Sequence, residues 1–165
     1  MHSLVIFVAK YFIVLSVGIA AYAWWQLNRA QKKAYILLAI VAGILSLLFA
    51  KASSKLYYDP RPFITGHFTP YFPHGNDNGF PSDHTLLSSF LAWLTLCYSR
   101  RLGWLMLLIS VLIGGARVIA RVHHVTDVVG AIMLSGAAVW LSKTVLLWLG
   151  FDRPPVTERP RTKAP

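Results

Sequence analysis

Long apolar runs separated by short polar turns dominate this sequence, and they predict its helices. Five runs have the composition of membrane helices: residues 4–25, 34–50, 81–98, 102–120 and 128–151. A helix that crosses a bilayer needs about 20 mainly apolar residues, and the third run offers only roughly fifteen after its start at Pro81 and Ser82. We therefore expect the third helix to begin inside a cavity and not at the membrane surface. The second helix should continue through Lys51 and Lys55, which then share one face.

The composition points to the same class of protein. Of 165 residues, 56% are hydrophobic and 13% are charged, and the mean hydropathy is +0.54. We predict an all-α fold, a polytopic membrane helical bundle of about five transmembrane helices. The first run lacks a small-residue cleavage site after a basic region, so we interpret it as a retained helix and not a signal peptide. The single cysteine, Cys97, excludes disulfides and cysteine metal sites within one chain.

The net charge of +10 narrows the choice of partners. The basic residues lie between apolar runs and not in one solvated patch, so we expect membrane lipids with anionic headgroups and phosphate-bearing substrates as partners, and no nucleic acid. The basic turns 29–33 and 100–101 fall on the same side as the tail 152–165, and the positive-inside rule makes that side cytoplasmic. The tail contains four prolines and four basic residues and is expected to be disordered, which leaves residues 1–151 as the membrane domain.

Candidate chemical groups gather on the opposite, exterior side. Ionisable groups at membrane depth are costly, so such a gathering indicates function. The long connection 57–79 is rich in Pro, Gly and aromatic residues, faces the same side, and is typical of a functional or interfacial loop. The residues on this side are Lys51, Lys55, Arg61, Ser82, Asp83, His84, Arg117, Arg121, His123 and Asp127.

The cations and one helix start on this side describe a site for a tetrahedral oxyanion. Lys55, Arg61 and Arg117 can neutralise phosphate oxygens, and each arginine offers a planar fork of donors. The backbone amides of Ser82 and Asp83, at a helix N-terminus, can add further donors. We therefore expect these positions to bind phosphate.

His123 and Asp127 supply the candidate nucleophile. Their spacing of four puts them on one face if they are helical, so Asp127 can hold one ring nitrogen and leave the other free to attack an electrophile. His84 would donate a proton to the leaving oxygen and then activate the water that hydrolyses the phosphohistidine. No cofactor and no metal is expected, because the exterior side offers few carboxylates.

Structural interpretations and other functions remain open at this point. Residues 81–84 can be no more than a helix cap, Arg61 can be an interfacial anchor, and Arg121 and His124 can be mere neighbours of the site. A haem-binding membrane protein, with His84 and His123 as axial ligands, is an alternative of another class. A purely structural membrane protein would leave the costly charges unexplained.

Residues 55–62, 81–84 and 117–127 resemble the three signature motifs of the type 2 phosphatidic acid phosphatase superfamily. The resemblance implies a metal-independent phosphohydrolase that works through a phosphohistidine. It also implies the roles just given: phosphate binding by Lys55, Arg61, Ser82 and Arg117, with His84 as acid, His123 as nucleophile and Asp127 as its orienter.

The sequence departs from the motifs at three places. Asp83 and Ala116 replace the usual Gly and Ser, and the first motif is one residue short between Lys55 and Arg61, which makes Lys51 a possible substitute.

The segments 61–63 and 79–85 and the small size are similar to the bacterial undecaprenyl pyrophosphate phosphatases. This branch implies an isoprenoid lipid pyrophosphate substrate and a place in the bacterial cytoplasmic (inner) membrane, with the site facing the periplasm or exterior. Phosphatases of phosphatidylglycerol phosphate, phosphatidic acid or lipid A are the alternatives among enzymes.

Overall fold

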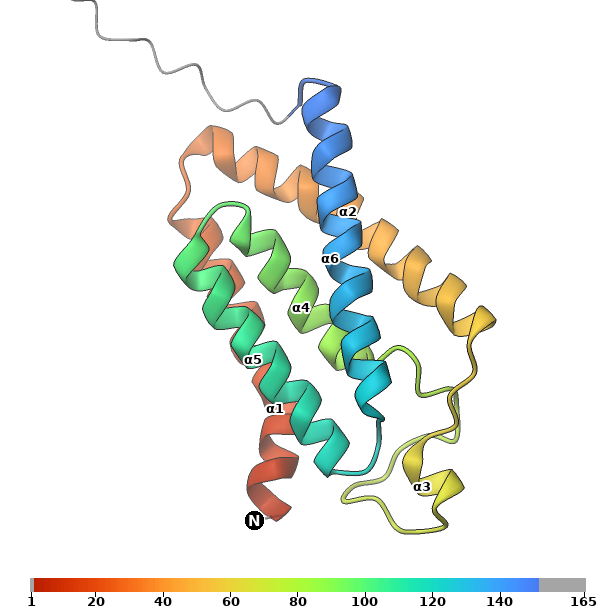
Figure 1. Cartoon of the computed structure of the whole chain (residues 1–165). Helices are drawn as coiled ribbons and strands as arrows, with labels where there is room; N and C mark the ends of the chain where they lie inside the picture. The colour runs from red at the N-terminus through yellow and green to blue at the C-terminus, as the bar shows by residue number, and fades with distance from the viewer. Residues whose placement is uncertain (1, 152–165) are drawn as a thin grey trace, which may run out of the picture.

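Six helices make up the described part of the chain, residues 2–151 of a computed structural model. Figure 1 shows the long helices as a bundle, with the connection between the second and fourth helices folded at one end. Met1 lies outside the described residues, and so does the tail 152–165, for which disorder was predicted. The helices are α1 (His2–Trp25), α2 (Arg29–Leu56), α3 (Pro62–Thr65), α4 (Asp83–Leu96), α5 (Arg100–Ile119) and α6 (Val125–Trp148).

The five long helices match the five predicted runs, which confirms the all-α membrane bundle. α1, α2, α5 and α6 are long and apolar enough to cross a membrane, by length and composition. α4 has 14 residues and is not one of these candidate spans, in agreement with the short third run. Residues 2–151 therefore contain four candidate spans and a shorter helix, where the sequence predicted about five transmembrane helices.

Two helices begin earlier than the apolar runs predict, because polar residues cap them. α2 starts at Arg29 since the Asn28 side chain accepts from the Gln31 backbone N–H at 2.9 Å, while the Gln31 side chain accepts from the Asn28 N–H at 3.2 Å. α6 starts at Val125, where Asp127 in the first turn accepts from the His124 N–H at 2.8 Å. Because these first turns are polar, the apolar runs do not predict where the two helices begin.

α4 lies in the middle of the bundle, packed against α1, α2, α5 and α6. Its buried face carries hydroxyl groups that pair with hydroxyls of the neighbouring helices: Ser88 Oγ donates to Ser110 Oγ at 2.9 Å, and the Ser89 and Ser135 hydroxyls are hydrogen-bonded at 2.7 Å. Small residues let the helices approach closely, and their hydroxyl groups are satisfied without water. Gly115 in α5, by contrast, faces open space.

One end of the bundle gathers all the segments that carry candidate chemistry. In the lower half of Figure 1, the start of α1, the end of α5 and the start of α6 come together with α3 and the connection 66–82. The turns that hold the basic residues, before α2 and between α4 and α5, lie at the other end. The fold thus separates a polar, functional end from a basic end, as the loop charges predict.

Candidate active site

His123 lies in the short connection between α5 and α6 and is 2% exposed. Its Nδ1 is 3.1 Å from Asp127 Oδ2, and its Nε2 is 3.2 Å from a guanidinium nitrogen of both Arg61 and Arg117. A guanidinium group only donates, so Nε2 is the acceptor and Nδ1–H donates to Asp127. Burial lowers the pKa of His123; the hydrogen bond to Asp127 opposes this effect and the two arginine charges reinforce it. The ring is therefore neutral, with its lone pair on Nε2.

Asp127 is fully buried in the first turn of α6. Its Oδ2 accepts from the His124 N–H as well as from His123, and its backbone carbonyl accepts from the Ser82 N–H at 3.2 Å. Its Oδ1 has no hydrogen-bond partner within residues 2–151. Asp127 thus caps the helix and fixes the imidazole through its carboxylate, and contacts the start of α4 through its backbone carbonyl.

Arg61 and Arg117 are buried cations, 3% and 2% exposed. Arg61 donates to the Val122 carbonyl at 2.9 Å, whereas Arg117 donates to the Ala9 carbonyl of α1 at 3.4 Å. Arg117 makes no salt bridge with any residue from 2 to 151, and its Nε is without a partner there. A buried charge without a counter-ion is costly, so the surroundings of Arg117 favour the binding of an anion.

Two loop residues contact these arginines, and neither was predicted as a site residue. His74 Nε2 accepts from Arg117 at 2.8 Å, and the His74 ring lies edge to face with the His123 ring. Burial lowers the pKa of His74 to about 4, helped by the charges of Arg61 and Arg117, so His74 is a neutral acceptor. Asp77 accepts from Arg61 at 3.0 Å. Partial burial would raise the pKa of Asp77, but the hydrogen bond and charge of Arg61 outweigh it and leave that pKa lowered.

Asn78 and Gly79 fasten this loop to the end of α2 and to the site. The Asn78 side-chain amide donates to the Ser54 and Tyr57 carbonyls, both at 2.9 Å. A Cβ on Gly79 would lie 3.0 Å from Asp127 Oδ2, so a larger residue would press on the carboxylate that holds His123. The loop's length and composition predicted a functional segment, but no pattern in it marks His74, Asp77 or Asn78.

Asp59, His124 and Asp127 form a group, called here the Asp59 cluster, whose ligand atoms lie within 4.8 Å of one another. Such spacing suits a metal ion, yet each carboxylate already has partners. Asp127 holds His123, while Asp59 lies 3.1 Å from His124 Nδ1 and accepts from the Thr126 hydroxyl at 3.1 Å. We interpret the cluster as a structural contact that holds the connection 57–79 against the start of α6, and we interpret His124 as a neighbour of the site.

The start of α4 brings the second motif to the same end of the bundle. Ser82 is fully buried, and its hydroxyl accepts from the Thr85 hydroxyl at 3.1 Å. Asp83 is exposed in the first turn, so its backbone amide and not its carboxylate suits an anion. His84 is half-buried; burial lowers its pKa to about 4, the charge of Arg117 adds to this effect and the charge of Asp83 opposes it.

Lys55 is the predicted residue that the structure does not bring into contact with the others. It lies exposed in the last turn of α2 and makes no hydrogen bond or salt bridge within residues 2–151. Lys51, the possible substitute, is also exposed one turn earlier. A phosphate-binding role for either lysine stays a prediction.

A neutral imidazole between buried cations, at one end of a membrane helix bundle, is the kind of site that a membrane phosphatase requires. Comparison with known proteins identifies the family. Residues 33–151 match the PAP2 superfamily, the type 2 phosphatidic acid phosphatases, and this chain belongs to that family of phosphatases.

Two relatives have names that concern one lipid. The chain is 28% identical over 135 residues to undecaprenyl-diphosphatase BcrC of Bacillus subtilis (strain 168), which covers 82% of this chain and 69% of the relative. It is 32% identical over 148 residues to the putative undecaprenyl-diphosphatase YbjG of Escherichia coli (strain K12), which covers 85% of this chain and 74% of the relative.

The fold is similar to a crystal structure of a transmembrane PAP2-type phosphatidylglycerolphosphate phosphatase from Bacillus subtilis. The TM-score is 0.63 at 22% identity, and the similarity covers 90% of this chain and 77% of that chain. This likeness concerns the fold, and with the apolar helices it supports a multi-pass membrane protein.

Proposed function

We propose that this protein removes the terminal phosphate of undecaprenyl pyrophosphate, giving undecaprenyl phosphate and inorganic phosphate. The observation that carries the proposal is the position of His123 Nε2, 3.2 Å from both Arg61 and Arg117. Because Arg117 is buried and has no acidic partner among the described residues, an anion from outside is needed to complete the site. The choice of lipid rests on the relatives named undecaprenyl-diphosphatase.

In the first step, His123 Nε2 attacks the terminal phosphorus in line with the bridging oxygen. The guanidinium groups leave Nε2 and bind the equatorial phosphate oxygens, where negative charge builds up. The Asp83 amide donates to the same oxygens, and so does the Ser82 hydroxyl, which accepts from Thr85 and keeps its own proton; the Ser82 amide already donates to the Asp127 carbonyl. The bond from phosphorus to the bridging oxygen breaks, and undecaprenyl phosphate departs with that oxygen.

In the second step, water hydrolyses the phosphohistidine. The negative charge of the bound pyrophosphate raises the low pKa of His84, which then protonates the leaving oxygen in the first step and takes a proton from the attacking water in the second. Asp127 keeps the His123 ring in the tautomer that attacks and stabilises the positive charge that the ring acquires. Lys55, on the rim, would attract the pyrophosphate before it enters.

We further propose that the site faces the periplasm or exterior of a bacterial cytoplasmic membrane. The basic turns 29–33 and 100–101 lie at the other end of the bundle, the arrangement that the positive-inside rule associates with the cytoplasm. The lipid product would therefore be released in the outer leaflet.

Haem binding is not favoured. His123 Nε2, which would have to bind the iron, lies 3.2 Å from two guanidinium nitrogens. Two fixed positive charges at that distance oppose a cationic metal and favour an anion.

The test is a phosphate-release panel on purified protein with undecaprenyl pyrophosphate, a shorter isoprenoid pyrophosphate, phosphatidic acid and phosphatidylglycerol phosphate. We expect the isoprenoid pyrophosphates to have the highest kcat/KM. His123→Ala should abolish turnover, and stopped wild-type reactions should contain acid-labile phosphate on His123. His124→Ala is the matched control, because it removes the neighbouring imidazole that contacts only the Asp59 cluster. Near-normal turnover in His123→Ala would overturn the mechanism, and a preference for glycerolipid phosphates would overturn the substrate.

A further inference from the structure

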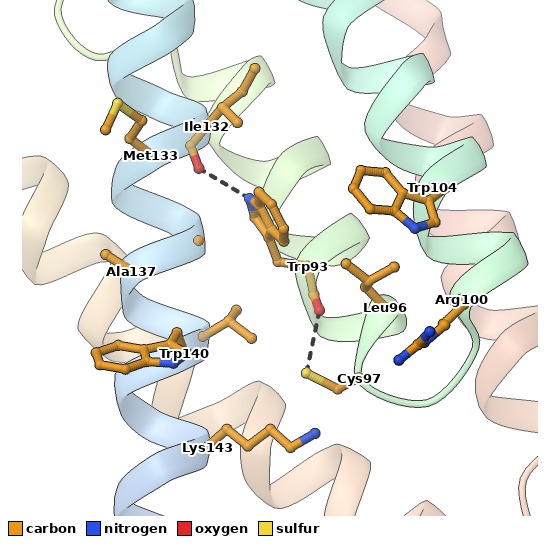
Figure 2. Close-up of a pocket in the computed structure, with 12 residues that line it drawn as sticks. Trp93, Leu96, Cys97, Arg100, Trp104, Ile132, Met133, Ala137, Trp140 and Lys143 are labelled. Atoms are coloured by element: carbon orange, nitrogen blue, oxygen red, sulfur yellow. Dashed lines mark hydrogen bonds between the residues drawn. The ribbon is translucent and has the colours of Figure 1, made fainter.

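A groove of about 800 Å³ lies between α4, α5 and α6, at the end of the bundle away from the active site (Figure 2). Its volume falls within the range of small-molecule binding sites, about 300 to 1,000 Å³. α5 and α6 are candidate membrane spans, so the groove opens where lipid surrounds the protein. Nothing in the phosphatase mechanism uses it.

The wall of the groove is apolar and built from large side chains. Trp104, Met133 and Trp140 are exposed, whereas Trp93 is held in place by its indole N–H, which donates to the Ile132 carbonyl at 3.1 Å. Figure 2 shows Trp93 in the middle, with Trp104 of α5 on one side of it and Trp140 of α6 on the other. Such a wall suits a hydrocarbon chain.

The mouth of the groove is basic. Arg100, at the start of α5, and Lys143, in α6, extend toward each other from opposite sides at the lower end of Figure 2. No acidic residue lines the groove. Within residues 2–151 the acidic residues are Asp59, Asp77, Asp83 and Asp127, and all belong to the segments at the active-site end. No acidic residue among 2–151 therefore neutralises the charge at this mouth, and an anionic group is its complement.

We propose that this groove binds an anionic phospholipid, with its phosphodiester between Arg100 and Lys143 and one acyl chain along the tryptophan wall. The order of the groups matches that of a lipid, because the cations lie at the end of the bundle and the apolar wall runs from there toward the membrane interior. Long basic side chains and tryptophans are the residues that anchor proteins at this depth. A soluble anion would not need the wall, and a neutral lipid would not need the cations.

The test is lipid retention measured by native mass spectrometry. The full-length protein is equilibrated in mixed micelles with equal amounts of phosphatidylglycerol and phosphatidylcholine that carry identical acyl chains, and the bound lipids are counted. Wild type should retain phosphatidylglycerol preferentially. Arg100→Gln with Lys143→Gln should lower the ratio of the retained lipids at least about tenfold, since each cation near a headgroup contributes to binding anionic lipid.

The matched control is Arg29→Gln with Arg101→Gln, which removes the same charge at the same end of the bundle but outside the groove. It should keep the preference. Ala137→Phe fills the groove and leaves both cations, so it should lower the retention of both lipids. This variant is a second test of the proposal if the double variant does not fold.

Three results would overturn the proposal. The first is equal retention of the two lipids by wild type. The second is an equal loss of preference in the control, which would make the effect one of net charge. The third is a wild-type dimer that Ala137→Phe converts to a monomer with no change in retained lipid, which would assign the groove to a second copy of the chain.

Discussion

Asp127→Asn tests the proposed role of the carboxylate most directly, because it removes a charge and almost no volume. In the protein the Nδ1–H of His123 donates to Asp127 Oδ2, so Nε2 holds the lone pair that faces the arginines. A side-chain amide can turn its NH₂ group toward Nδ1, which favours the tautomer with the proton on Nε2. That tautomer cannot attack phosphorus.

The size of the effect follows from the geometry. When Nε2 bonds to phosphorus, the ring gains positive charge with its Nδ1 3.1 Å from the carboxylate. A full charge at that separation is stabilised by about 5 kcal/mol at an effective dielectric constant of about 20. A transition state with about half the charge loses about half of that energy, and a tenfold change in rate is about 1.4 kcal/mol. We therefore expect the lost charge to slow phosphoenzyme formation by about 10², and the change of tautomer to add to this loss.

The assay is rapid-quench, single-turnover formation of phosphoenzyme from radiolabelled isoprenoid pyrophosphate, which isolates this step from hydrolysis and product release. Asp59→Asn is the control, because it makes the same change in charge beside His124 without touching His123. Its rate should stay within about threefold of wild type, as expected for a partly exposed pair. A rate for Asp127→Asn within about threefold of wild type, in protein with unchanged thermal unfolding, would refute the orienting role.

Four further predictions concern the same site. His84→Ala should slow phosphoenzyme formation from an isoprenoid monophosphate at least about tenfold more than from the pyrophosphate, because only the alkoxide leaving group strongly needs a proton; equal losses would argue against His84 as general acid. Activity should survive excess chelator, and loss restored by one added divalent metal would assign a metal to the Asp59 cluster. With the native cysteine replaced, Gly75→Cys should react with an impermeant thiol reagent in cells whose outer membrane is permeabilised, and Ser99→Cys should not; the reverse would place the site in the cytoplasm. The pKa of His123 is lowered by burial, so its neutral form persists as pH falls. With an ordinary histidine pKa of about 6.5, the rate of phosphoenzyme formation at about pH 6 would be about a quarter of its plateau value, and the measured rate should exceed that fraction.

The helical plan was readable from the sequence because lipid leaves a chain few alternatives. Backbone groups in a bilayer must be hydrogen-bonded internally, so each apolar run of sufficient length has to be a helix. The same constraint explains the helix ends that were missed. Arg29 and Val125 start their helices by polar capping at the membrane surface, where water offers the backbone other partners and hydropathy carries no information.

Within the site, the predictable part is the part that lies on or beside helices. The predicted contact of His123 with Asp127 is present, although His123 lies just before α6 and only Asp127 lies in its first turn. His74 and Asp77 lie in a loop without periodicity, and they reach arginines 43 and 16 residues away, a contact that no local pattern encodes. Lys55 is the opposite case: it lies on a helix end at a motif position, yet its side chain is exposed and contacts none of the other site residues.

The salt bridge between Arg61 and Asp77 joins a side chain that is 4% exposed to one that is 71% exposed. In the proposed mechanism, Arg61 is a buried cation that has no substrate bound between turnovers. Asp77 of the loop then serves as its counter-ion. Because the carboxylate remains mostly in water, such a pair is worth only about 0 to 1 kcal/mol, and an arriving phosphate with more charge and more oxygens displaces it at little cost. The departing phosphate faces the same competitor, so the loop that stabilises the empty site also helps to clear it.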